Sequence, residues 1–217
     1  MKPIYLALLS GLYLLGACNG VPVPKPKGYF RIDLPPRKYQ SFDQPGYPYR
    51  FEYPVYAHIV KDSSYFEEQP QNPYWVNVEF PQFHSRIYLS YINIGTSAIY
   101  KVKNGAGLYR DSSGVNTFDK LVNDAFNLTN RHSEVATSID QYPISPRPGV
   151  SGFIFEVGGN AATAEQFFVT DSVRHFLRGA LYFDVAPNED SLKPVNRFLL
   201  EDMKHLINTL QWKSVNN

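Results

Sequence analysis

Three side chains that are close together in the sequence have the types needed for hydrolytic chemistry. Asp171, Ser172 and His175 could supply an orienting carboxylate, a nucleophile and a base. A catalytic triad is defined by its geometry, however, and not by closeness along the chain. Asp and Ser are also common at turns, because their side chains bond to nearby backbone groups, and no Gly-x-Ser-x-Gly elbow is present. We therefore interpret Asp171-Ser172 as a structural turn and expect no enzymatic activity.

The histidines do not form a metal-binding pattern. They are scattered at positions 58, 84, 132, 175 and 205, with no His-x-His pair and no cysteine beside them. We therefore expect neither a metal nor another cofactor.

A second group of residues is suited to binding. Alternate side chains of a strand share one face. One face of the strand after the turn would therefore carry four basic and aromatic side chains: Arg174, Phe176, Arg178 and Tyr182. This stripe could bind an acidic partner or a glycan, and if it is exposed it is the candidate interaction surface. The alternative, which we favour, is a solvated or helix-covered face whose arginines pair with carboxylates.

One carboxylate interrupts the apolar face of the last predicted helix. That helix opens at residues 188–191, has Pro194 in its first turn, and places Asp202 among Val195, Phe198 and other apolar residues. An unpaired buried charge is very costly. We therefore predict that Asp202 is a structural buried polar residue that accepts a hydrogen bond from an Arg, His or Tyr of the predicted strands between residues 150 and 184.

The strands that would position these residues lie between residues 150 and 184. Three runs rich in Phe, Val, Ile and Tyr are separated by turn residues, which predicts an antiparallel meander. Further strands are predicted at residues 29–34, 49–53, 56–60, 74–80 and 86–91. Residues 95–114 are expected to form a long surface loop, and a helix with Asn116 as its N-cap should follow. Pro143, Pro146 and Pro148 predict a loop before the meander. Together these elements predict a single α+β domain over residues 28–213, with a mainly antiparallel sheet covered by helices.

The composition excludes some function classes. The net charge is +1, and it becomes zero if residues 1–17 are removed, because Lys2 is their only charged residue. A neutral chain has no long-range field to attract nucleic acid. We therefore expect no nucleic-acid partner.

The N-terminus predicts a lipid anchor. Lys2 is followed by an apolar run over residues 4–17, which suits a secretory signal but is too short to span a bilayer. The run ends in Leu15-Gly16-Ala17-Cys18, which resembles a bacterial lipobox, and Cys18 is the only cysteine. We predict a signal peptide over residues 1–17, lipidation at Cys18, and an extended Pro/Lys linker over residues 18–27.

Several strings of residues resemble one bacterial family. They occur in order along nearly the whole chain after Cys18, with the least similarity between residues 105 and 115. The strings lie at residues 24–32, 47–51, 159–167, 170–172, 175–176, 178–183, 187–188, 190–191, 194–195 and 202. On them the chain resembles the gliding-motility lipoproteins of the GldD family. The order of strands and helices also resembles the PsbP-type α/β/α sandwich, which bears on fold alone.

The resemblance implies a non-catalytic accessory lipoprotein of the gliding and type IX secretion machinery. Its expected partners are the membrane, through Cys18, and other lipoproteins or components of that machinery. It would be anchored in the cell envelope and face the periplasm, on either the inner or the outer membrane. An envelope lipoprotein that binds a carbohydrate or another small ligand is the alternative. A concave pocket lined by tyrosine and tryptophan would favour that alternative.

Overall fold

The computed structural model describes residues 31–61, 71–103 and 109–214. The chain divides into two units, Met1–Asp33 and Leu34–Asn217. In the first unit, Nε of Arg31 donates to Oδ1 of Asp33 at 2.9 Å, and both side chains are exposed. The predicted signal peptide, the lipidation site Cys18 and the Pro/Lys linker lie outside the described residues. Every helix and strand described below belongs to the second unit.

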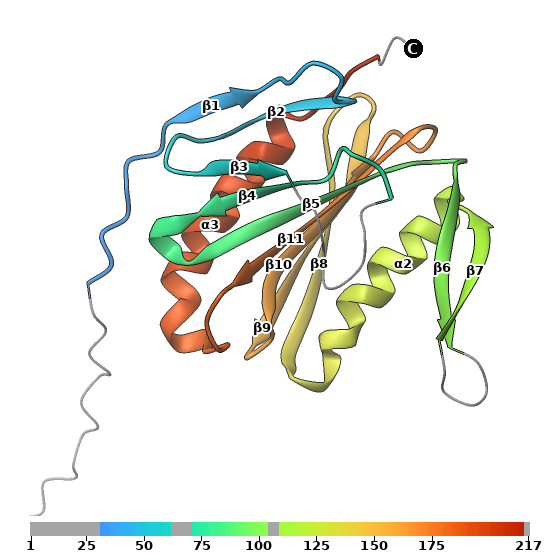
Figure 1. Ribbon diagram of the computed structural model, residues 1–217. Coiled ribbons are helices and arrows are strands. Elements are labelled where there is room, and N and C mark those ends of the chain that lie inside the picture. The colour runs from blue at the N-terminus through green and yellow to red at the C-terminus, as the bar shows by residue number, and fades with distance from the viewer. Residues whose placement is uncertain (1–30, 62–70, 104–108, 215–217) are drawn as a thin grey trace, which may run out of the picture. The chain divides into compact units, whose positions relative to one another are not determined.

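The second unit is built on a seven-stranded antiparallel sheet (Figure 1). Neighbouring strands are all antiparallel, as expected for a sheet connected by short turns. In order across the sheet, the strands are β3 (His58–Lys61), β4 (Val76–Phe80), β5 (Ser85–Asn93), β11 (His175–Phe183), β10 (Thr163–Thr170), β9 (Val150–Gly159) and β8 (Ala136–Arg147).

The predicted meander is confirmed as β9, β10 and β11. Gly159 has a φ of 90°, a conformation that glycine adopts without steric cost, so it can end β9 at the turn. Gly179 of β11 lies opposite Phe167 of β10, and a Cβ atom at Gly179 would lie 2.1 Å from the Phe167 ring. The glycine therefore allows this large core side chain to lie across the neighbouring strand.

The loop predicted from the three prolines is wrong in part. Pro143 and Pro146 belong to β8, the last strand of the sheet, which pairs with β9. A strand at the edge needs hydrogen bonds on one side only, so it can accept residues without an N–H group. Pro148, by contrast, lies in the turn between β8 and β9.

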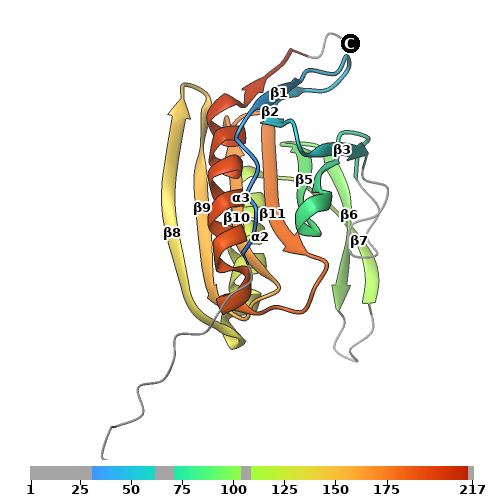
Figure 2. The same ribbon diagram turned by 90° about the vertical axis from the view of Figure 1, so that its left-hand side faces the viewer.

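Helix α3 (Glu189–Thr209) covers one face of the sheet (Figure 2). Its N-cap is Asn188, whose side chain accepts a hydrogen bond from the backbone of Ser191. The larger hydrophobic core lies between this helix and the sheet. Its members include Ile87, Ile154, Phe167, Leu181, Leu199, Met203 and Leu206.

Helix α2 (Phe118–Asn130) covers part of the other face. It packs Leu121 and Ala125 on three phenylalanines, Phe155, Phe168 and Phe176. The helix is capped by Thr117, whose side chain accepts from the backbone of Lys120, and not by the predicted Asn116. In the described part of the chain, no helix combines the length and apolar character needed to cross a membrane.

Two smaller sheets complete the second unit. One has the order β1 (Tyr39–Phe42), β2 (Tyr49–Pro54) and β12 (Gln211–Trp212). The other is a hairpin of β6 (Ser97–Lys103) and β7 (Tyr109–Val115), so the long surface loop predicted at residues 95–114 is wrong where these two strands pair. Asn116 closes the base of the hairpin through backbone hydrogen bonds with Gly95 and Thr96. Of the strand predicted at residues 29–34, residues 29–30 lie outside the described residues, and residues 31–34 form no strand. The predicted α+β architecture, a mainly antiparallel sheet with helices on its faces, is confirmed.

Candidate interaction surface

The turn before β11 is held together by Asp171. Its Oδ1 accepts hydrogen bonds from the backbone N–H groups of Val173, Arg174 and His175, at 2.8–2.9 Å. Burial raises the pKa of the Asp171 carboxyl, but these hydrogen bonds outweigh it, and the pKa is lowered overall. Ser172 sits at the tip with a φ of 65°, which is uncommon for a residue with a side chain.

His175 has partners other than Ser172. Its Nδ1 is 2.6 Å from the hydroxyl of Tyr91, and its ring stacks on Trp212 at 4.9 Å. Burial lowers the pKa of His175, although the nearby Asp171 carboxylate opposes this. Among the described residues, no hydrogen bond joins Ser172 to His175. The three residues therefore form a turn with an aromatic contact and do not have the geometry of a triad.

The predicted stripe is divided between buried and accessible residues. Phe176 is only 2% exposed, since helix α2 covers it, and it must be removed from the candidate surface. Arg174 precedes β11 and is exposed. Arg178 and Tyr182 are half-buried, farther along the same face. Helix α2 therefore covers one of the four residues of the stripe, and Arg174 is exposed to solvent.

Arg178 and Tyr182 lie beside polar and aromatic residues of neighbouring strands. Nη2 of Arg178 donates to Oε1 of Gln166 at 2.6 Å. Tyr182 meets Tyr88 of β5 edge to face, with ring centroids 5.7 Å apart. The guanidinium of Arg86 lies 5.9 Å from the centre of the Tyr88 ring. We call Arg86, Tyr88, Arg178 and Tyr182 the arginine–tyrosine surface.

Sequence reasoning missed the two members on β5. The register places Tyr88 opposite Ala180 and Arg86 opposite Tyr182, so these residues share a face with Arg178. The Arg86-x-Tyr88 alternation was the available signal, but only the pairing of β5 with β11 shows its direction. Arg86 also forms ion pairs with Glu79 at 3.3 Å and Asp184 at 3.0 Å. The surface can therefore offer aromatic rings and two guanidinium groups, which suits protein recognition.

Asp202 is buried, as predicted, at 1% exposure. Its Oδ1 accepts a hydrogen bond from the Tyr39 hydroxyl at 3.0 Å, and its Oδ2 accepts one from the Tyr56 hydroxyl. Nε of Arg37 lies 3.4 Å from Oδ1. The partner types agree with the prediction, but their place does not. They come from β1 and the segments beside β1 and β2, because α3 presents Asp202 to this small sheet and not to the meander.

The segment that contains Arg37 and Tyr39 makes further contacts with α3. Nη2 of Arg37 donates to the carbonyl oxygen of Phe198 at 3.0 Å, and its guanidinium lies 4.4 Å from the centre of the Phe198 ring. Tyr39 stacks on His205, with ring centroids 3.5 Å apart. Burial, followed by the hydrogen bond to Asp202, raises the pKa of Tyr39 to about 12. We call Arg37, Tyr39, Tyr56 and Asp202 the Asp202 clasp.

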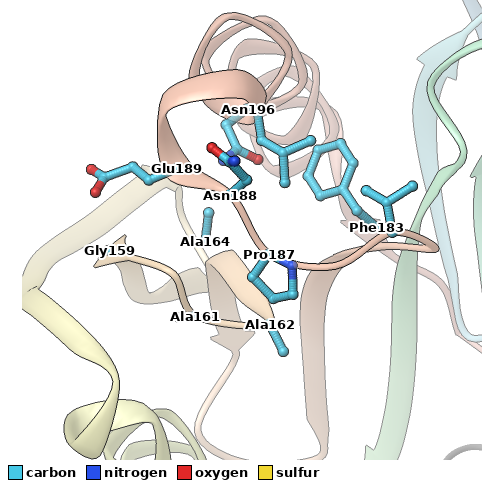
Figure 3. A pocket seen from close by; sticks show the side chains of 11 residues that line it. Gly159, Ala161, Ala162, Ala164, Phe183, Pro187, Asn188, Glu189 and Asn196 are labelled. Atoms are coloured by element: carbon cyan, nitrogen blue, oxygen red, sulfur yellow. The ribbon is translucent and has the colours of Figure 1, made fainter.

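A hollow lies at the start of α3 (Figure 3). It is lined by small and apolar groups such as Ala161, Ala164 and Pro187, together with Asn188 and Asn196. Its volume of about 10 Å³ is enough for about one water molecule. It has no tyrosine or tryptophan in its lining, so it does not provide the aromatic pocket that the ligand-binding alternative requires. Among the described residues, no group of three or more His, Cys, Asp or Glu side chains could hold a metal ion.

Comparisons with known proteins give one family. No curated protein matches the chain. Among solved structures, the chain is similar to the solution structure of cyanobacterial PsbP (CyanoP) from Synechocystis sp. PCC 6803. The identity is 11%, the TM-score is 0.41, and the match covers 85% of this chain and 98% of that one.

The family model of the gliding motility lipoprotein GldD matches residues 19–212. The match contains all the described strands and both helices, and it ends at the last residue of β12. It therefore includes the arginine–tyrosine surface and the Asp202 clasp. The chain belongs to the gliding motility lipoprotein GldD family.

Proposed function

We propose that this protein is anchored in the cell envelope through a lipidated Cys18 and faces the periplasm. There it acts without catalysis, as an assembly or stabilising component of the gliding motility and type IX secretion machinery. The observation that carries the proposal is the family match, which begins at residue 19, directly after Cys18, and continues through the folded unit. The arginine–tyrosine surface, with the exposed Arg174 beside it, is the proposed contact with the machinery.

The arginine and tyrosine side chains of this surface are of the types that stabilise protein–protein contacts. Arginine and tyrosine are enriched among residues that dominate protein interfaces, because each offers a large flat group with a polar end. Arg86 is partly neutralised by Glu79 and Asp184, whereas Arg178 is bound to the neutral Gln166. The guanidinium of Arg178 thus retains its positive charge for an acidic partner.

Lipidation is tested by replacing the cysteine. We expect the native protein to lose residues 1–17 and to carry fatty acyl chains, because the lipobox precedes Cys18. Cys18→Ser should carry none and should leave the lipid-anchored fraction, since three acyl chains give stable attachment and one does not. Intact mass and membrane fractionation measure both results, with Asn19→Ala as the control. Equal acyl mass in Cys18→Ser and wild type would refute the anchor.

The binding role is tested by crosslinking and pull-down from native membranes. We expect components of the secretion machinery to co-purify with the wild type, and to fall at least about fivefold with Arg174→Ala/Arg178→Ala. Lys193→Ala/Arg197→Ala is the matched control, because it removes two positive charges from the exposed side of α3. Thermal unfolding of each variant verifies that it is folded.

Two outcomes would count against this reading. Recovery of the wild type as a monomeric lipoprotein alone would overturn the binding role. Equal recovery of partners by the Arg174→Ala/Arg178→Ala variant and its control would move the contact away from the arginine–tyrosine surface.

A further inference from the structure

Three carboxylates form a row across neighbouring strands on the α3 side of the sheet. The register places Asp140 of β8 opposite Glu156 of β9, and Glu156 opposite Glu165 of β10. Residues directly opposite each other project to the same face. That face is the α3 side, because Ile154 and Phe167, two residues away on β9 and β10, belong to the core beneath α3. We call Asp140, Glu156 and Glu165 the carboxylate row.

The row is unfavourable for the fold by itself. Like charges directly opposite each other in a sheet are destabilising. In the described part of the chain, none of the three carboxylates makes a hydrogen bond or an ion pair. Lys204 of α3 is the cation that acts on Glu165, but its Nζ is paired with Glu201 at 3.3 Å. Lys204 therefore relieves the row only in part, since it shares its positive charge with Glu201.

The row leads from the surface into the protein. Asp140 is exposed, Glu156 is half-buried, and Glu165 is only 6% exposed, with no partner for its Oε2. Tyr142 lies two residues beyond Asp140 on β8 and is 47% exposed. Figure 2 shows α3 in front of the sheet, with β8 at the edge beyond it. The outer end of the row is thus accessible beside an aromatic ring.

The chemistry of the row selects a cationic ligand. A guanidinium is planar and can donate to two carboxylates at once, and it also stacks on aromatic rings. Opposite positions on adjacent strands place the Cβ atoms about 5 Å apart, which is a suitable distance for one cationic head group between two carboxylates. A metal ion is less suitable, since the described acidic groups do not form a metal cluster.

We propose that the carboxylate row, with Tyr142 beside it, binds an Arg or Lys side chain of a basic segment in a partner protein. The cationic group sits between Asp140 and Glu156, and Glu165 lies behind it. This binding surface is on the opposite side of the sheet from the arginine–tyrosine surface and does not depend on it.

The protonation state of Glu165 should make the affinity for the cation depend on pH. Burial, followed by the Glu156 carboxylate, raises the pKa of Glu165 to about 8, and Lys204 opposes the shift. A cation placed beside Glu156 favours the charged form of Glu165 and so releases its proton. Affinity should therefore increase with pH up to about pH 8, and Glu165→Gln should remove this increase.

The proposal is tested on the purified protein with a fluorescent peptide of alternating Arg and Gly at low ionic strength. We expect Asp140→Asn/Glu156→Gln to weaken binding at least about tenfold, since both carboxylates that hold the cation are lost. Asp119→Asn/Glu134→Gln is the matched control, because it removes two exposed negative charges elsewhere and should change affinity less than about twofold.

Three results would overturn the proposal. The first is equal weakening in the two double variants, which would indicate non-specific attraction. The second is that the peptide does not bind to the wild type. The third is displacement of the peptide by calcium chloride at concentrations at which sodium chloride of equal ionic strength has no effect. Titration of Glu165→Gln supports the proposal if affinity no longer rises between about pH 6 and pH 8, and it counts against it if the rise persists. Because no membrane or secretion component is present, the result is independent of the proposed role in the machinery.

Discussion

Asp202→Ala is expected to lower the free energy of unfolding by about 2–4 kcal/mol. The change removes the acceptor for the Tyr39 and Tyr56 hydroxyls and leaves the guanidinium of Arg37 without its carboxylate. For a chain of this size, the melting temperature should fall by about 4–16 °C. Urea unfolding and calorimetry measure the two quantities.

Neighbouring substitutions show whether the effect belongs to the Asp202 clasp. Glu201→Ala is the matched control, because Glu201 is exposed and its pair with Lys204 is on the surface, so its loss should cost less than about 1 kcal/mol. Tyr56→Phe should be destabilising by itself but add little to Asp202→Ala, since the two share one interaction. Strict additivity of the two changes, or an Asp202→Ala protein as stable as the Glu201→Ala control, would contradict the assigned role.

Glu165→Gln is expected to stabilise the protein at pH 8 and to have little effect at pH 4.5. Burial and the Glu156 carboxylate raise the pKa of Glu165 to about 8 in the folded state, from an ordinary value of 4.5. The folded state therefore keeps this proton at pH values where the unfolded state has lost it. The stability that goes with protonated Glu165 is complete below pH 4.5 and is lost as the pH rises through about 8.

The difference between the folded and unfolded pKa values of Glu165 sets how much stability the wild type loses between pH 4.5 and pH 8. This loss in the free energy of unfolding is at most about 5 kcal/mol. A neutral glutamine avoids the burial of a charge, so the stability of Glu165→Gln should change less between pH 4.5 and pH 8. Urea unfolding at a series of pH values measures the slope. Parallel pH profiles for the wild type and Glu165→Gln would show that the pKa of Glu165 is not raised in the folded state. Glu134→Gln, on the surface, should leave the slope unchanged.

The parts of the fold that depend on local patterns could be predicted from the sequence. The meander follows from aromatic and branched runs separated by turn residues, and α3 follows from its apolar stripe and its capping residues. Strand β8 could not be predicted, because its prolines are tolerated only at a sheet edge, and edge position is a property of the whole sheet. The β6–β7 hairpin could not be predicted either, because its residues have a composition typical of loops and are held as strands by backbone pairing.

The partners of the functional residues depend on distant pairing. Asp202 is recognisable from its place in the α3 stripe, but Tyr39 and Tyr56 lie 163 and 146 residues away in the sequence. The surface around Arg178 could be found only from the register between β5 and β11, which places Tyr88 on the same face. Glu165 is followed by the polar Gln166, and nothing in this local pattern shows that α3 covers its side chain. In each case the residue type was visible in the sequence, and its surroundings were not.

The Asp202 clasp also determines how the folded unit would carry mechanical load. With Cys18 lipidated as proposed, any tension between the membrane and the machinery enters this unit from its N-terminal side, through Arg37 and Tyr39. Arg37 lies just before β1 and Tyr39 is the first residue of this four-residue strand, and both contact α3, which runs through the larger core. Force is therefore transmitted to the most deeply packed helix and is not borne by the short edge strand alone. The Asp202 clasp would therefore protect the short strand β1 from being pulled off its sheet under tension.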